Sequence, residues 1–389
     1  MCLQSFLHGG RNSFLVMSMT EIRYTKLLET LPATVPFVGP ETQERARGEI
    51  FSARLGANES VFGPSPKAIA AMVQSASDIW KYGDPTSHDL RNALSARLGV
   101  CSENIVIGEG IDGLLGYLAR MLVEEGDTVV TSDGAYPTFN YHVAGFGGRL
   151  IKVPYKQDHE DLDALLQAVK EHDAKLVYLA NPDNPMGTYH DATAIEAFIE
   201  ALPKTCLLAF DEAYVEFAPE EASPKSDKIW PNVVRFRTFS KGYGMAGARV
   251  GYAFAPRDII REFEKIRNHF GMNRAAQAGA LAALEDNEWL HAVRKNVSKA
   301  RDRIGEIARN NGLDVISSAT NFVTIDCGRE GAFAKAVLDQ LISHGIFVRM
   351  PFVAPQNRCI RVSVGTEKDL DLFETVLPQA LATARSEQG

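Results

Sequence analysis

The chain has 389 residues, of which 45% are hydrophobic and 23% charged, and its formal net charge at pH 7 is -8. These values are those of a globular protein with a substantial core and enough length for two ordinary domains. The acidic balance argues against nucleic acid or an acidic membrane as a partner, and no apolar run approaches the roughly 20 residues that span a bilayer. We therefore expect small-molecule chemistry.

Cysteine and histidine usage narrows this expectation. Five cysteines are scattered without a Cys-x-x-Cys pair, and an odd number cannot all form internal disulfides, which favours a reducing cytoplasm. The nine histidines include no His-x-x-x-His pair, and the acidic run 158–161 is typical of a solvated helix start, so we expect no metal site. Residues 1–19 carry no small-residue cleavage site and are interpreted as a ragged extension, with an upstream start as one explanation.

The N-terminal residues 20–54 are expected to form an arm that contributes to a small domain. A short helix is predicted over Ile22–Leu31, and Pro32, Pro36 and Pro40 then break regular structure. Two helices follow, over Lys67–Ser75 and Asp89–Leu98, with a turn at 80–85 between them.

The next part alternates apolar runs with amphipathic stretches, which is typical of a mostly parallel sheet covered by helices. Helices are expected over Gly113–Val123, Leu162–His172 and Thr193–Leu202. The fold class is therefore α/β, with a large domain, residues 55–284, built on a seven-stranded sheet. The predicted strands are Ile105–Ile107, Thr128–Thr131, Leu150–Val153, Leu176–Ala180, Cys206–Phe210, Val233–Phe236 and Val250–Phe254.

The remainder, residues 285–389, is predicted to be a smaller α/β domain. Helical patterns over Ile259–Asn268 and Ala275–Asn311, the second interrupted at 285–287, link it to the large domain. Its expected elements are strand Asn321–Ile325, helix Ala332–Ser343, strands Ile346–Arg349 and Cys359–Val364, and helix Lys368–Ala382.

Gly108-Glu109-Gly110-Ile111-Asp112-Gly113 matches Gly-x-Gly-x-x-Gly between a predicted strand and a predicted helix. With Asp133 twenty residues beyond Gly113, it fits the fingerprint for a dinucleotide such as NAD. Free amides at the same helix N-terminus could instead bind a single phosphate, or the glycines could serve only a tight turn. The motif alone leaves all three open.

The stretch Val233 to Gly251 presents one lysine, Lys241, after a strand and among hydroxyls, glycines and Arg249. An amine held near a fixed cation and away from bulk water loses its proton and can form a Schiff base. Hydroxyls and an arginine beside it suit a phosphorylated carbonyl cofactor. A surface lysine in a glycine-rich turn is the alternative.

Two further loops follow predicted strands, whose carboxyl ends meet in one crevice in open α/β sheets. Asn181-Pro182-Asp183-Asn184-Pro185-Met186-Gly187 has two Asn-Pro steps, which keep it extended and turned and leave amides free for a ligand. Asp211-Glu212-Ala213-Tyr214 places a carboxylate at a strand end and a phenol three residues later. A buried carboxylate needs a cation or donors, and a protonated ring nitrogen would serve. Taken separately, each loop also suits a structural role.

Together with Lys241, these loops resemble the fold-type I pyridoxal-phosphate aminotransferases, in particular the histidinol-phosphate aminotransferase branch. The resemblance runs from about Pro36 to the last helix and includes Tyr82-Gly83-Asp84-Pro85, Gly110-Ile111-Asp112 and Arg361-Val362-Ser363-Val364-Gly365. It implies pyridoxal 5'-phosphate as cofactor and a homodimer in which Tyr82 reaches into the phosphate site of the other subunit.

The resemblance also implies a role for each matching residue. Lys241 would hold the cofactor as a Schiff base and move a proton during the reaction. Asp211 would keep the pyridine nitrogen protonated so that the ring accepts electrons, and Asn184 and Tyr214 would hydrogen-bond its phenolic oxygen. Tyr136, in preference to Phe139, would stack on the ring. The phosphate ligands would be Ile111, Asp112, Thr238, Ser240 and Arg249.

For the substrate, the resemblance points to Arg361 and Arg349, because guanidinium groups bind carboxylates and phosphates bidentately. Asn58 and Phe37 complete the set. Phe37 stands where the resembling enzymes carry a Pro-Tyr tyrosine that grips the substrate phosphate, and it lacks that hydroxyl.

The implied activity is transfer of an amino group from histidinol phosphate to a 2-oxo acid, with 2-oxoglutarate as the expected acceptor. The alternative donor is an aromatic or other non-phosphorylated amino acid. Of other classes, a pyridoxal-phosphate lyase or decarboxylase remains open, whereas a cofactor-binding regulatory domain attached to a DNA-binding module is disfavoured because the chain has no basic patch.

Overall fold

The computed structural model describes residues 22–33 and 38–387. Its centre is a seven-stranded sheet in the order β2-β8-β7-β6-β5-β3-β4. Neighbouring strands are parallel except at β8, which is antiparallel to both β2 and β7. The predicted seven-stranded, mostly parallel sheet is therefore confirmed. Its strands are β2 (Ile105–Gly108), β3 (Thr128–Ser132), β4 (Arg149–Val153), β5 (Leu176–Ala180), β6 (Leu207–Asp211), β7 (Val233–Thr238) and β8 (Gly251–Phe254).

Helices cover both faces of this sheet because successive side chains of a strand point to opposite faces. In β5, Leu176 and Tyr178 join the core beneath α5 (Gly110–Leu122) and α6 (Pro137–Gly145). Val177 and Leu179 join the core beneath α7 (Leu162–Glu171) and α8 (Ala192–Ala201). The continuous apolar run in β5 thus fits a strand that is buried on both faces.

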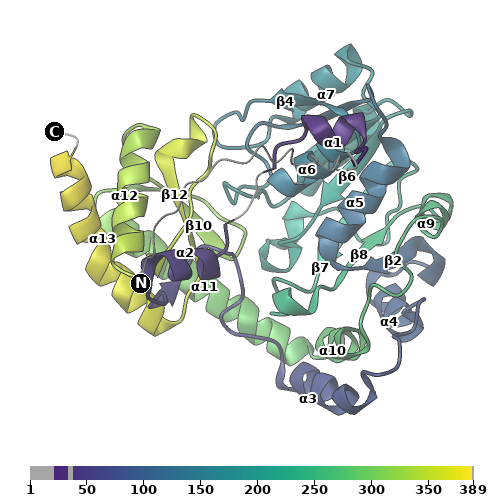
Figure 1. Ribbon diagram of the computed structural model, residues 1–389, viewed down its shortest axis with the longest axis horizontal. Coiled ribbons are helices and arrows are strands. Elements are labelled where there is room, and N and C mark those ends of the chain that lie inside the picture. Colours follow the sequence, from purple (N-terminus) through teal and green to yellow (C-terminus); the bar gives the residue numbers. More distant parts are fainter. Residues whose placement is uncertain (1–21, 34–37, 388–389) are drawn as a thin grey trace, which may run out of the picture.

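A third group of helices packs at the β2–β8 edge of the sheet (Figure 1). It consists of α3 (Pro66–Ser75), α4 (His88–Leu98) and α10 (Arg274–Glu285), and α9 (Arg257–Phe263) lies nearby against α5. α11 (Asn287–Asn310) then continues from α10 into the C-terminal part of the molecule (Figure 1). The predicted interruption of the long helical stretch at 285–287 is confirmed.

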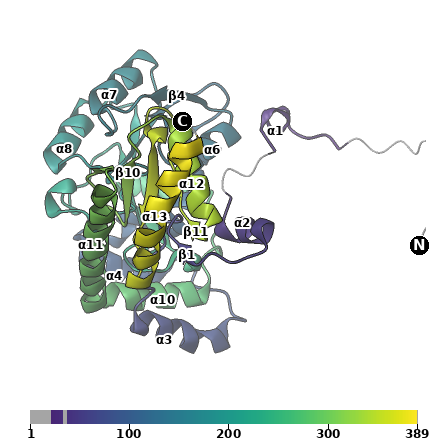
Figure 2. The same cartoon turned by 90° about the vertical axis from the view of Figure 1, so that its left-hand side faces the viewer.

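The C-terminal part has its own core between helices and a three-stranded antiparallel sheet in the order β12-β10-β9. The N-terminal arm belongs to this part, since β1 (Ala53–Arg54) pairs in parallel with β11 (Ile346–Phe347), and α2 (Pro40–Arg47) lies close to both strands (Figure 2). The remaining elements are β9 (Asp314–Ile316), β10 (Phe322–Asp326), α12 (Gly331–Ser343), β12 (Cys359–Ser363) and α13 (Glu367–Glu387).

Some local expectations were wrong. Pro40 does not break structure but opens α2, because proline at the first helical position loses no hydrogen bond. The helix predicted over residues 22–31 spans only α1 (Lys26–Thr30), and the helix predicted over 259–268 ends at Phe263. The elements α6 and β9 were not predicted. Within the described ranges, no helix is long and apolar enough to cross a membrane.

Candidate active site

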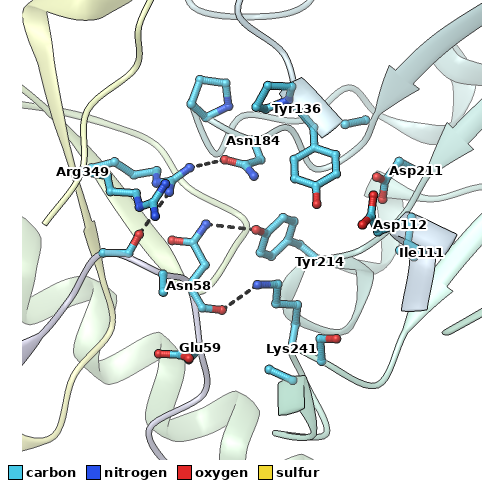
Figure 3. Close-up of a pocket in the computed structure, with 18 of the residues that line it drawn as sticks. Asn58, Glu59, Ile111, Asp112, Tyr136, Asn184, Asp211, Tyr214, Lys241 and Arg349 are labelled. Carbon is cyan, nitrogen blue, oxygen red and sulfur yellow. Dashed lines mark hydrogen bonds between the residues drawn. The ribbon is translucent and has the colours of Figure 1, made fainter. Parts of the chain in front are cut away.

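A cavity of about 400 Å³ lies where the carboxyl ends of the large sheet face the C-terminal part (Figure 3). Its place follows from the sheet, because side chains that follow parallel strands converge at one edge. Thirteen of the predicted site residues line it: Asn58, Ile111, Asp112, Tyr136, Asn184, Asp211, Tyr214, Thr238, Ser240, Lys241, Arg249, Arg349 and Arg361.

Lys241 follows β7 and points its amine into this cavity (Figure 3). Its Nζ donates a hydrogen bond of 2.8 Å to the backbone oxygen of Asn58 and lies 5.6 Å from the centre of the Tyr214 ring. Burial lowers the pKa of Lys241 to about 8, and the charges of Arg361 and Arg249 act in the same direction. A fraction of the amine is therefore unprotonated near neutral pH, and this is the form that attacks a carbonyl carbon.

Asp211, the last residue of β6, is 5% exposed and accepts two hydrogen bonds. Tyr178 donates its hydroxyl to Oδ2 at 2.7 Å, and Ala213 donates its backbone N–H to Oδ1 at 2.9 Å. Burial nevertheless raises the pKa of Asp211 to about 6, and the charge of Lys241 offsets only part of that rise. A buried carboxylate in this state would be stabilised by a cation brought by a ligand.

The end of the cavity beside α5 brings a helix N-terminus close to hydroxyls and a guanidinium. Gly110 has a φ of +78°, and a Cβ there would lie 2.5 Å from Nη2 of Arg249. A Cβ at Gly251 would lie 2.6 Å from the backbone of Gly110, so both positions require glycine for this close approach. The backbone N–H of Ser240 donates to Oγ1 of Thr238 at 3.0 Å. Helix N-termini attract phosphate through their free amides and dipole.

Asn58 joins the two halves of the cavity. Its Nδ2 donates to the hydroxyl of Tyr214 at 3.0 Å, and its Oδ1 accepts from Oγ of Ser363 at 2.8 Å. The backbone oxygen that accepts from Lys241 also accepts from Nδ2 of Asn321, at 3.1 Å. Asn58 thus orients the lysine and the tyrosine from the C-terminal side.

Two arginines enter from the C-terminal part, Arg361 on β12 and Arg349 after β11. Arg361 donates through Nη1 to Oδ1 of Asn184, and through Nη2 to the backbone oxygen of Gly56 at 3.2 Å. Arg349 donates through Nη2 to the backbone oxygen of Val38 at 2.9 Å. Burial lowers the pKa of Arg361 to about 10, which still leaves it charged at neutral pH. The pair forms a cationic end suited to an anionic substrate group.

Tyr136 and Phe139, the two aromatic candidates, have different surroundings. Tyr136 lines the cavity, and burial raises the pKa of its hydroxyl to about 12. Phe139 is fully buried and stacks on Tyr178, with ring centres 4.7 Å apart. Of these two aromatic residues, only Tyr136 lines the cavity and can contact a ligand there.

One predicted residue lies outside this cavity, and another lies outside the described residues. Tyr82 is 78% exposed and its ring lies 4.8 Å from that of Phe270, outside the cavity of its own chain. Phe37 lies outside the described residues.

Sequence reasoning missed Tyr178 and Glu59. Tyr178 looks like one apolar residue of a buried strand, although its position three residues before Asn181 on the strand that enters the site was a usable signal. Glu59 lines the cavity, and its charge opposes part of the lowering of the Lys241 pKa that burial causes. Its side chain follows no predicted strand or motif, so the sequence offered no signal for it.

This arrangement matches the chemical groups of a phosphorylated pyridine aldehyde such as pyridoxal phosphate. An amine of lowered pKa faces the same space as a buried carboxylate of raised pKa, and a helix N-terminus borders it. The dinucleotide interpretation of Gly108 to Gly113 is wrong, because its fingerprint needs a βαβ unit with parallel neighbouring strands. β2 pairs antiparallel with β8, and four strands separate it from β3.

Comparison with known proteins agrees with this geometry. The family model described as "Aminotransferase class I and II" matches residues 53–376. The histidinol-phosphate aminotransferase of Moorella thermoacetica is 33% identical over 364 residues, which cover 92% of this chain and 93% of the relative. The "Histidinol-phosphate aminotransferase 2" of Carboxydothermus hydrogenoformans is 35% identical over 347 residues, covering 88% of this chain and 94% of the relative.

Among solved structures, the histidinol-phosphate aminotransferase of Sinorhizobium meliloti, in complex with pyridoxal 5'-phosphate, superimposes with a TM-score of 0.91 at 53% sequence identity. The match covers 94% of this chain and 100% of that chain. The family match spans the whole large sheet, the connecting helices and most of the C-terminal part. The chain therefore belongs to the class I and II aminotransferases.

Proposed function

We propose that this protein is a pyridoxal-phosphate-dependent histidinol-phosphate aminotransferase that passes the amino group to a 2-oxo acid, with 2-oxoglutarate as the expected acceptor. The observation that carries the chemistry is that Lys241 and Asp211 line one cavity. The pKa of Lys241 is lowered toward neutrality and that of Asp211 is raised toward it. The similarity to histidinol-phosphate aminotransferases over most of the chain supports the substrate.

When bound, pyridoxal phosphate supplies an aldehyde that condenses with amines and a ring that accepts electrons. Lys241 would provide the amine that holds the cofactor, and its Nζ would move a proton between the α-carbon of the substrate and the C4′ carbon of the cofactor. Asp211 holds a proton on the ring nitrogen, which also neutralises its own buried charge. The hydroxyl of Tyr214 accepts from Asn58, so its proton is available for the phenolic oxygen of the ring. Oδ1 of Asn184 accepts from Arg361, so its amide N–H groups are available too.

Substrate recognition would rest on Arg349 and Arg361. The two guanidinium groups can bind the phosphate of histidinol phosphate in one half-reaction and the carboxylates of a 2-oxo acid in the other. The backbones of the two residues are hydrogen-bonded to one another, which fixes their spacing. Lyase and decarboxylase chemistry remain outcomes of the experiment below.

Single-turnover measurements on the purified enzyme would test this function. With pyridoxal phosphate bound, we expect histidinol phosphate to bleach the visible absorbance of the cofactor fastest among donors that include phenylalanine and aspartate, and 2-oxoglutarate to restore it. A Lys241→Ala variant would lose turnover, whereas Lys335→Ala, a surface control whose amine pairs with Asp339, would not. If phenylalanine bleaches the absorbance rapidly and histidinol phosphate does not react, the amino donor is phenylalanine and not histidinol phosphate. If the purified protein binds no pyridoxal phosphate, the proposed function is refuted.

A homodimer is also part of the proposal. Large apolar side chains are exposed along residues 73–82, with Val73 at 68% and Trp80 and Tyr82 at 78% each, which is unusual for a free surface. A second copy covering this face would bring Tyr82 toward the phosphate end of the other active site. Light scattering over a range of concentrations should give the mass of a dimer, and a fully active monomer would contradict the idea.

We place the enzyme in the cytoplasm, because Cys101, Cys206, Cys327 and Cys359 are all free thiols. Cell fractionation would check this location.

We also propose the division into an arm at 20–54, a large domain at 55–284 and a small domain at 285–389. Separate cores in the two parts and the pairing of β1 with β11 support it, and limited proteolysis at residues 284–288 would test it.

A further inference from the structure

Tyr155 has no part in the chemistry above, yet it contacts the loop that carries Asn184. It follows β4 and is 9% exposed, and its ring packs in a small cluster with Met186 and Cys359. Its hydroxyl donates a hydrogen bond of 2.8 Å to Oδ1 of Asp183, which is 2% exposed. A buried carboxylate depends on such donors, so this hydroxyl is more than a packing group.

Asp183 stabilises, through hydrogen bonds, the backbone turn that contains Asn184. Its Oδ2 accepts from the backbone N–H of Met186 at 2.9 Å, and its own N–H donates to the backbone oxygen of Thr188 at 2.8 Å. Asn184 lies inside this turn, and its side chain points into the cavity (Figure 3). The direction of the Asn184 amide therefore depends on the carboxylate of the preceding residue.

The C-terminal part grips the same turn from the opposite side. Thr324 of β10 donates its hydroxyl to the backbone oxygen of Pro185 at 2.8 Å. The backbone N–H of Ala319 donates to the backbone oxygen of Gly187, also at 2.8 Å. Arg361 reaches the side chain of Asn184 itself. The turn is thus fixed between β10 and β12 on one side and the Tyr155–Asp183 hydrogen bond on the other.

We propose that Tyr155 and Asp183 form a positioning pair that aims Asn184 at the phenolic oxygen of the cofactor and at Arg361. The inference rests on the proposed function and adds two residues that touch neither cofactor nor substrate. Loss of the tyrosine hydroxyl would let the turn relax, so Asn184 would bind the ring oxygen less well while the polypeptide stays folded.

The test is Tyr155→Phe, which removes only the hydroxyl and keeps the ring against Met186 and Cys359. In the intact enzyme we expect the affinity for pyridoxal phosphate to fall by about tenfold. We also expect the pH midpoint of the visible absorbance of the bound cofactor to shift, because that midpoint reports hydrogen bonding to the phenolic oxygen. Tyr252→Phe is the matched control, since it removes another buried hydroxyl, on β8, and should leave both quantities unchanged.

A double-mutant cycle with Asp183→Ala, which removes the acceptor of the Tyr155 hydroxyl, separates positioning from general loosening of the fold. If the two residues act as a pair, their effects on cofactor affinity are less than additive, because the second change finds the hydrogen bond already lost. Additive effects, or a Tyr155→Phe variant with the affinity and pH midpoint of the unaltered enzyme, would overturn the inference whatever its melting temperature. If the unaltered enzyme binds no pyridoxal phosphate, the proposed function fails instead.

Discussion

Asp211 and Glu212 are neighbours at the end of β6, and both are buried, yet their surroundings are opposite. Glu212 is fully buried and forms ion pairs with Arg235, at 2.7 Å, and with Arg237, at 3.0 Å. Burial alone would raise the pKa of Glu212, but the two arginines lower it to about 2. Asp211 has a phenol and a backbone N–H instead, and burial raises its pKa to about 6.

We interpret this difference as that between a structural carboxylate, Glu212, and a ligand-binding carboxylate, Asp211. Consecutive side chains at a strand end point to opposite sides, so one carboxylate can face the protein interior and the other the cavity. The chain itself supplies the cations for Glu212. For Asp211 we infer that the cofactor supplies the cation, and three predictions, in order of size, test this contrast.

The largest effect is expected for Glu212→Gln. The change would leave Arg235 and Arg237 buried without a counter-charge, and breaking a buried pair in this way costs ~3–5 kcal/mol in the free energy of unfolding. Chemical denaturation measures it, with Glu221→Gln as an exposed control that should change stability by less than about 0.5 kcal/mol. Equal loss in both variants would mean that Glu212 is not the structural partner.

Asp211→Asn should show the reverse pattern. Without the carboxylate charge that would keep the ring nitrogen protonated, turnover should fall by about 100-fold to 1000-fold, which is the usual effect of removing one electrostatic stabiliser. The cofactor-free variant should be no less stable than the unaltered protein at pH 7.5, because a costly buried charge is gone. Steady-state kinetics and denaturation check the two halves, and a variant that unfolds easily but turns over normally would invert the assignment.

The smallest effect concerns pH. Since the pKa of Asp211 is raised in the folded protein, its contribution to the stability of the cofactor-free form is complete below about pH 4 and is lost as the pH rises through about 6. We expect this loss to be ~2–3 kcal/mol. It appears as the difference between the stability-versus-pH curves of the unaltered protein and Asp211→Asn. Saturation with pyridoxal phosphate should flatten it, and a difference that is constant from pH 4 to 8 would contradict the prediction.

Much of the architecture could be predicted from the residues. The seven apolar runs became the seven strands, because strands covered by helices on both faces are rich in apolar residues; β4, at the edge of the sheet, is less buried. The polar residues at the ends of β5, β6 and β7 meet in the cavity, because the carboxyl ends of parallel strands lie at the same edge of the sheet. Elements with weak or mixed patterns escaped prediction, such as α6, which begins at Pro137 and has apolar residues on several sides.

By itself, the sequence determined the fold class, the family resemblance and the choice of Lys241 and Asp211 as candidate site residues, since these depend on local pattern and on the order of residues along the chain. Only the tertiary structure decided which carboxylate meets the arginines, that Asn58 holds Lys241 and Tyr214, and that Tyr155 supports the Asn184 turn. Each of these contacts joins residues more than 20 positions apart. Such contacts form only when the strands and the two parts of the molecule have packed together, and no local pattern encodes them.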